Sequence, residues 1–155
     1  MAIASSCIYD ILKQDMLGSN AINLAAAGNL CKCALFTSSY PSAGSSADTA
    51  YGVGNLNANE VSYGAATPAT AYSMTAANNS IITTAHPVIG WTNTTNGGNG
   101  SAVWTSASFT ANCAVIYNST VSNHAVCCIL FGGDKQVTAG TFTISWNASG
   151  ILTLT

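Results

Sequence analysis

The side chains that could carry out acid–base chemistry in this sequence are few and scattered. Five carboxylic acids occur in 155 residues: Asp10, Asp15, Asp48, Glu60 and Asp134. Glycoside hydrolysis needs two carboxyl groups across one cleft, and no local motif pairs any two of these acids. We expect Asp10 and Asp15 to be solvated on a helix, and Asp134 to bond backbone N–H groups in a Gly-Gly-Asp-Lys turn. The acids therefore predict no catalytic pair.

The six cysteines and two histidines could supply a nucleophile or metal ligands. His86 precedes a proline, in an extended break of the chain. His124 precedes Cys127 and Cys128, but an apolar run raises the pKa of a thiol and makes it a poor nucleophile. Cys31-x-Cys33 lacks a second ligand pair at zinc-binding spacing.

We therefore expect no enzyme activity, no catalytic residues, no cofactor and no metal ion. The cysteines are interpreted as small buried apolar side chains, because a chain of this length can bury a full core without disulfides. A bridge that forms after release into an oxidising medium stays open as an alternative.

The charge content excludes several classes of partner. Charged residues make up only 5% of the chain, and the three lysines are dispersed with no arginine to join them. Nucleic-acid binding through phosphates needs a basic patch, as does a polybasic membrane-surface module. The longest apolar run, 125–131, is shorter than the roughly 20 residues of a membrane span. The N-terminus lacks the pattern of a secretory signal, so we expect a soluble chain made in the cytosol.

The elements that position these residues are mostly strands. From Thr141 the sequence alternates, with Phe142, Ile144 and Trp146 on one face and Thr141, Thr143 and Ser145 on the other. A turn at 147–150 would let the chain return as a hairpin, in which Trp146 faces Leu152 and Ile144 faces Leu154. These five apolar residues form the predicted structural core: Phe142, Ile144, Trp146, Leu152 and Leu154.

The rest of the chain gives one domain, 1–155. Residues 8–17 have the spacing of an amphipathic helix that ends at Gly18 or Asn20, within an N-terminal helix or arm over 1–20. A hairpin turn is expected at 118–123, and Gly132-Gly133-Asp134 is expected to turn the chain again. The predicted fold class is all-β, an antiparallel β-sandwich or jelly roll. The predicted strands are 20–24, 30–36, 80–84, 88–92, 101–110, 113–117, 124–131 and the C-terminal pair.

Residues 37–79 form a long segment with no sustained period, apart from a predicted turn of helix around 48–53. A structureless loop of this length is unusual in a compact domain, so it holds short elements or contacts another subunit. The candidate interface residues are Tyr40, Tyr51, Tyr63 and Tyr72, because tyrosine supplies contact area with a polar tip. The alternative, that these rings only cover an edge of the sandwich, stays open.

The C-terminal half contains WTSASFTANCAVIYNST, then FGGDKQVTAGTFTISW, then GILTLT. In this order the blocks resemble a group of small virion structural proteins of tailed bacteriophages. The pieces YDILKQDML, INL and CALFTSSY resemble the start of the same group, in which a short helix leads into strands. The resemblance covers both ends of the chain and leaves the middle divergent. It includes neither Cys31 and Cys33 nor Cys127 and Cys128.

The resemblance implies a virion structural protein, most similar to capsid decoration (cement) proteins. The expected partners are the major capsid protein and copies of this chain, as a homotrimer. The expected location is the capsid surface of the virion, after synthesis in the host cytoplasm. The alternative is a tail or fibre component that binds host glycan through Trp91 or Trp104. A hydrolase is a third hypothesis, for which the sequence offers no arranged site.

Overall fold

The computed structural model describes residues 6–18, 31–40, 47–61, 72–73, 79–83, 87–91, 101–145 and 152–153. Within these ranges two helices, α1 (Asp10–Leu17) and α2 (Asn55–Ala58), accompany eight strands. The first four strands are β1 (Cys7–Ile8), β2 (Cys31–Phe36), β3 (Tyr72–Ser73) and β4 (Asn79–Thr83). The others are β5 (Pro87–Trp91), β6 (Ser101–Asn118), β7 (His124–Ser145) and β8 (Leu152–Thr153).

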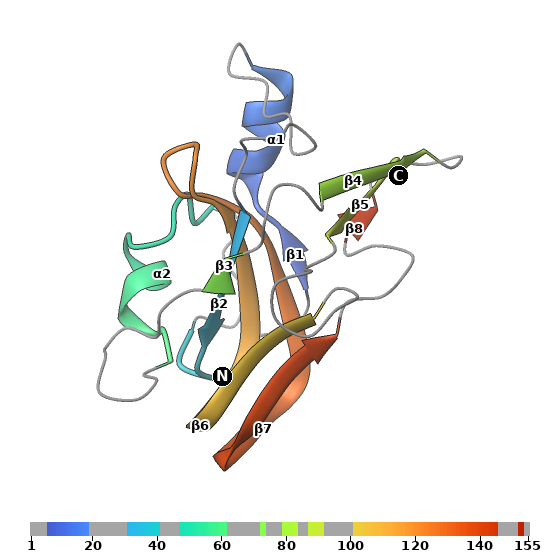
Figure 1. Ribbon diagram of the computed structural model, residues 1–155. Coiled ribbons are helices and arrows are strands. Elements are labelled where there is room, and N and C mark those ends of the chain that lie inside the picture. Colours follow the sequence, from blue (N-terminus) through green and yellow to red (C-terminus); the bar gives the residue numbers. More distant parts are fainter. Residues whose placement is uncertain are drawn as a thin grey trace.

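The long antiparallel hairpin of β6 and β7 organises the fold. Its two strands lie side by side, and α1 stands near and beyond the end where they are joined (Figure 1). β2 and β3 extend the sheet beyond β6, and β1 extends it beyond β7, in the order β1-β7-β6-β2-β3. A second sheet has the order β4-β5-β8. The all-β fold class with a short N-terminal helix is confirmed. Packing of the two sheets as a sandwich or jelly roll stays a prediction.

The sheet is buried on both faces where β2, β6 and β7 lie side by side. Alternate residues of β2 separate into two apolar clusters: Cys31, Cys33 and Leu35 join one, and Ala34 and Phe36 the other. Every residue from 113 to 117 and from 125 to 128 is buried. This pattern confirms what the continuous apolar runs predict, because a strand covered on both faces has no polar side.

Most predicted local elements are confirmed. The helix begins at Asp10 and ends at Leu17, with Gly18 at its C-cap. β2 matches the strand expected at 30–36, and the hairpin turn between Asn118 and His124 is present. The strands expected at 101–110 and 113–117 are one continuous strand, and the helical turn expected around 48–53 occurs at 55–58 instead. The strand expected at 20–24 lies outside the described residues.

The turn expected at Gly132-Gly133-Asp134 is wrong, because β7 continues through it as a bulge. Ala111 pairs with Lys135 and Cys113 with Leu130, so four residues of β7 stand opposite Asn112 alone. Both glycines have positive φ, which absorbs the extra length without ending the strand. The Asn112 side-chain amide donates to Asp134 Oδ1 over 2.8 Å across the bulge.

The C-terminal hairpin is also wrong in its pairing. Leu152 pairs with Ile89 and Thr153 with Val88, so β8 belongs to the second sheet. The strand that ends at Ser145 pairs along β6 instead. The alternating pattern identified the strand and its faces, but a period of two does not determine which strand becomes the partner.

Candidate functional site

The described members of the predicted core lie on the expected side of the sheet. Phe142 and Ile144 are half-buried and pack against the cluster that contains Trp104 and Phe109. The Phe142 ring centroid lies 5.9 Å from that of Trp104 and 5.1 Å from that of Phe109. The side chain of Leu152 is not described, and Trp146 and Leu154 lie outside the described residues.

The candidate interface tyrosines separate into different roles. Tyr40 is 0% exposed and packs on Phe36 within this chain, so its ring belongs to the core and presents no surface to another subunit. Tyr51 is half-buried and stacks on Tyr117, with centroids 4.1 Å apart and planes at 5°. Tyr63 lies outside the described residues, and only the backbone of Tyr72, paired with Cys33, is described.

A chain of hydrogen bonds crosses the buried face beneath the segment 47–61. The Tyr40 hydroxyl donates to Asp48 Oδ2 over 2.9 Å, and the Tyr9 and Tyr40 oxygens lie 2.7 Å apart. Because Tyr40 uses its only proton on Asp48, Tyr9 must be the donor to Tyr40. Burial raises the pKa of both phenols, so both keep their protons. Asn55 Nδ2 donates to the other oxygen of Asp48 over 3.3 Å.

Glu60 is a second partly buried acid of the segment 47–61. Its Oε2 accepts a 2.8 Å hydrogen bond from the Tyr51 hydroxyl, whereas its Oε1 is buried without a hydrogen-bond partner among the described residues. Burial raises the pKa of the Glu60 carboxyl to about 7, against the opposing effect of the Tyr51 hydrogen bond. Glu60 therefore titrates near neutral pH while it packs beside the stacked tyrosines.

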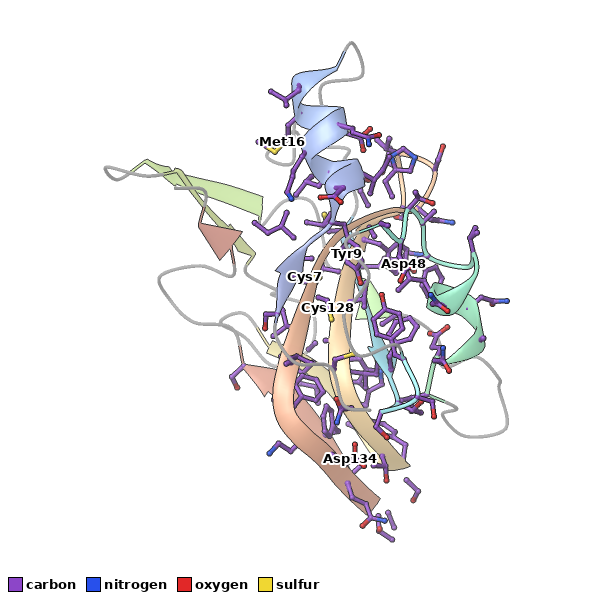
Figure 2. The ribbon with its side chains drawn as sticks, turned by 180° about the vertical axis from the view of Figure 1, so that it is seen from behind. Cys7, Tyr9, Met16, Asp48, Cys128 and Asp134 are labelled. Atoms are coloured by element: carbon purple, nitrogen blue, oxygen red, sulfur yellow. The ribbon has the colours of Figure 1, made fainter. Side chains whose placement is uncertain are left out.

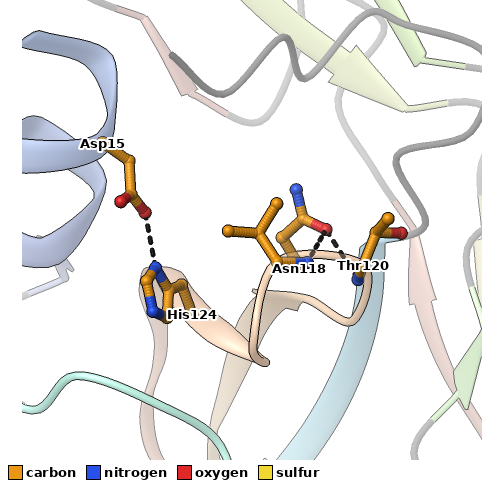
Figure 3. A network of polar contacts seen from close by, with 5 residues as sticks. Asp15, Asn118, Thr120 and His124 are labelled. Atoms are coloured by element: carbon orange, nitrogen blue, oxygen red, sulfur yellow. Dashed lines mark hydrogen bonds and ion pairs between the residues drawn. The ribbon is translucent and has the colours of Figure 1, made fainter. Parts of the chain in front are cut away.

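Asp15 and His124 join α1 to the start of β7 (Figure 3). His124 Nδ1 lies 2.7 Å from Asp15 Oδ2, and the Asp15 side chain is only 8% exposed. The expectation that Asp15 is solvated is wrong, because the helix turns this carboxylate toward the hairpin. Beside it, Asn118 Oδ1 accepts from the Thr120 and Val121 backbone N–H groups and closes the β6–β7 turn.

Among the described residues, which include His124 but not His86, no cysteine–histidine nucleophile is brought together. The short contact of His124 is with Asp15, and Cys127 is buried with a pKa raised by burial and by neighbouring thiols. Burial also raises the pKa values of Cys31 and Cys33 to about 12, so these thiols are protonated at neutral pH. Within the described part of the chain the six cysteines are thiols rather than disulfides, and no group of metal-ligating side chains gathers in a metal-binding arrangement.

The half of the β6–β7 hairpin that is remote from its turn exposes a surface of mostly uncharged polar side chains. We call residues 101–111 and 135–145 the distal ribbon. β2 pairs with β6 only from Asn118 to Cys113, and β1 pairs with β7 only at Cys128 and Cys127. Within the described residues, the distal ribbon therefore pairs only with itself. Its exposed side chains are mainly hydroxyls: Thr105, Ser106, Ser108, Thr110, Thr138, Thr141, Thr143 and Ser145.

An open depression with a volume of about 400 Å³ lies on β7, between residues around 131–135 and residues 142–144. Its lining combines three half-buried apolar side chains with one lysine and one threonine: Phe131, Lys135, Phe142, Thr143 and Ile144. Sequence reasoning assigned Phe142 and Ile144 to the core and missed this surface. The alternating pattern of β7 predicts which residues share a face, but it does not predict how far the neighbouring strands extend to cover that face.

No helix in the described ranges is both long and apolar enough to cross a membrane. Comparison with protein-family models, with curated proteins and with solved structures finds no match to this chain.

Proposed function

We propose that this chain is a non-enzymatic structural protein of a tailed-bacteriophage virion, which decorates the capsid and stabilises it as a cement protein. The resemblance of its N- and C-terminal sequence blocks to small phage virion proteins supports the class. The distal ribbon carries the physical argument. Among the described residues no further strand pairs along it, and exposed strand edges are where other chains add to a sheet.

The chemistry of the distal ribbon suits repeated contacts on a shell. Apart from Lys135 at its start, it contains no charged residue, so docking it desolvates few charges. Hydroxyl side chains and the apolar depression offer moderate contacts, which become strong when many copies bind one lattice. The partners in this proposal are the major capsid protein and further copies of the chain, as a homotrimer.

The test compares particles assembled with and without this protein. The proposal predicts a copy number comparable with that of the major capsid protein, and lower heat resistance in particles that lack the chain. A handful of copies per particle, or equal heat resistance, would contradict a cement role.

A charge placed in the depression tests whether the distal ribbon is the contact surface. Thr143→Arg adds a bulky cation at an exposed position of β7, and we expect normal folding with at least tenfold lower incorporation into particles. Gln14→Arg, at an exposed position of α1, is the matched control and should incorporate normally. Equal incorporation of both variants would place the contact elsewhere.

The alternative, a tail or fibre adhesin for host glycan, loses one of its two candidate rings. Trp104 is 6% exposed and packs edge-on against Phe142, so it cannot stack on a sugar from solution. The side chain of Trp91 is not described. Loss of glycan-array binding on Trp91→Ala would favour the adhesin over the cement protein.

A further inference from the structure

Three thiols lie across one face of the main sheet where β1 joins β7. Cys7 stands directly opposite Cys128 in the register of β1 and β7. Cys113 lies on the neighbouring strand β6, and Cys113 and Cys128 belong to the same buried cluster, against which Cys7 packs. The Cys128 thiol lies within hydrogen-bonding reach of Cys7, Cys113 and the Tyr9 hydroxyl. Figure 2 shows Cys7 and Cys128 close together beside Tyr9.

The strand register distinguishes which of these thiols can bond covalently. Directly opposed residues of antiparallel strands have Cα atoms about 4.5–5.5 Å apart, within the range of about 4.4–6.8 Å that disulfides span. Cys113 is diagonal to Cys128, because Cys128 is opposite Val115. Diagonal neighbours are about 7–8 Å apart, beyond that range. Cys7 and Cys128 are thus the pair that can close without moving the backbone.

On the opposite face, Cys33 and Cys127 are held too far apart to bond. Cys33 and Cys127 are both opposite Ile116, one from each side of β6. Two strand spacings of about 4.8 Å therefore separate them, which exceeds the reach of a disulfide. The geometry favours one bridge among these pairs.

We propose that Cys7 and Cys128 form a disulfide that fastens the N-terminal segment to β7 once the protein leaves a reducing environment. The proposal goes beyond a cement role and does not depend on it. In a reducing cytosol the two thiols are a packed cross-strand pair, and a disulfide oxidant converts them into a covalent bond between the first described strand and the central hairpin.

The reaction is two steps of thiol–disulfide exchange with a low-molecular-weight disulfide such as glutathione disulfide. The Cys7 thiol loses its proton and attacks one sulfur of the oxidant, forming a mixed disulfide and releasing one glutathione, which takes up the proton. The Cys128 sulfur then loses its proton, attacks the Cys7 sulfur and releases the second glutathione as a thiol. The protein loses two electrons and two protons, and the oxidant gains them.

Cys7 reacts first because its thiol is more accessible to the oxidant than that of Cys128. Cys7 is partly exposed on a two-residue strand at the edge of the sheet, whereas Cys128 is buried behind it. Hydrogen bonding to Cys128 and burial raise the pKa of the Cys7 thiol, so exchange at neutral pH is slow and becomes faster as the pH rises.

The experiment treats the full chain with glutathione disulfide at mildly alkaline pH, blocks free thiols with N-ethylmaleimide and maps the peptides without reduction. Trypsin cuts after Lys13, Lys32 and Lys135, so Cys7 alone labels the peptide 1–13. We expect 1–13 to be linked to 33–135. Further cleavage after Tyr117 separates Cys113 from Cys127 and Cys128.

Single variants identify the second sulfur. Cys128→Ser should abolish the linkage of 1–13, whereas Cys113→Ser and Cys127→Ser, at equally buried positions, should retain it. Fragmentation of the linked wild-type peptide assigns the bond independently if a variant fails to fold. Linkage of Cys7 to Cys113 or Cys127, or a fully alkylated Cys7 after oxidation, would overturn the proposal.

Stability gives a second readout. The oxidised wild type should melt several degrees above the reduced protein, and dithiothreitol should reverse the difference, because the bridge closes a loop of more than a hundred residues. Cys7→Ser, treated identically, should show no such rise. A bridge that forms but leaves the melting temperature unchanged would show that it does not stabilise the attachment of the N-terminal segment to β7.

Discussion

At the scale of single residues, Tyr40 is the central member of the hydrogen-bond chain that runs from Tyr9 to Asp48. Tyr40 accepts from Tyr9 and donates to Asp48, so Tyr40→Phe leaves the Tyr9 hydroxyl without its acceptor and removes a donor from a carboxylate. We expect a loss of about 1–3 kcal/mol in the free energy of unfolding.

Tyr9→Phe is the matched control, because it removes the donor to Tyr40 and leaves the bond from Tyr40 to Asp48 in place. Its cost should be smaller, about 0.5–1.5 kcal/mol, as measured by urea unfolding. An equal or larger loss for Tyr9→Phe would reverse the inferred direction of the chain.

Glu60 predicts a pH dependence of stability. Its pKa is about 7 in the folded protein and near 4.5 when unfolded, so the folded state holds the proton more tightly between these values. The stabilisation is complete below about pH 4.5 and is lost as the pH rises through about 7. Because the side chain is partly exposed, we expect a loss of about 1–3 kcal/mol, less than the full shift would give.

Glu60→Gln provides the comparison, since it keeps a neutral acceptor for Tyr51 at every pH. Melting temperatures of the wild type and of Glu60→Gln should converge at low pH, and the variant should be the more stable above pH 7. Tyr51 and Tyr117, which face Glu60, remain protonated in this window because burial raises the pKa of each phenol. Parallel pH profiles would contradict a buried carboxyl that titrates near neutral pH.

At the scale of elements, α1 depends on its contacts with the sheet. A helix of 8 residues is marginal in isolation, and α1 has two buried side chains, Leu12 and Asp15. Leu12→Ala should cost about 2–5 kcal/mol in contacts with the core and accelerate tryptic cleavage after Lys13 at least tenfold.

Leu17→Ala is the control within the same helix, because Leu17 is 90% exposed. It should leave both the stability and the cleavage rate nearly unchanged. Rapid cleavage after Lys13 in the wild type, with no further increase in Leu12→Ala, would show that α1 is not held by Leu12.

Two residues of β7 with positive φ, one in the bulge and one beyond it, predict substitutions of opposite sign. Gly133 has φ 137° with open space around it, so Gly133→Ala should destabilise by about 1–3 kcal/mol through backbone strain alone. Ala139 has φ 46°, and Ala139→Gly should be neutral to stabilising, by up to about 1 kcal/mol. Thermal unfolding of both variants decides the matter; a stable Gly133→Ala would mean that the bulge does not need this conformation.

The sequence predicts these elements unevenly, for physical reasons. Local periodicity and the glycine at the helix end identify α1, β2 and the β6–β7 turn, because those signals arise from neighbours in the chain. The sequence Gly132-Gly133-Asp134 is equally compatible with a turn and with a bulge, and the long pairing of β6 with β7 decides between them. Local sequence likewise does not determine the partner of Leu152, which pairs with Ile89 of β5 rather than with a residue of β7.

At the scale of the whole molecule, the candidate site follows from where strands end rather than from residue types. The scarcity of charge is evident in the sequence, but only the structure shows that, among the described residues, β1 and β2 pair with β7 and β6 outside the distal ribbon. Tyr40 illustrates the converse: its residue type suggests an interface, and its depth in the fold assigns it to the core.

The most direct test of the cement role is a reconstruction of the intact virion at a resolution that traces strands. A cement role predicts density for this chain at regular positions over the outer surface of the capsid, with the distal ribbon and the depression at Phe142 against neighbouring subunits. Density confined to the tail or its fibres would contradict the account, as would capsid density in which the distal ribbon faces solvent.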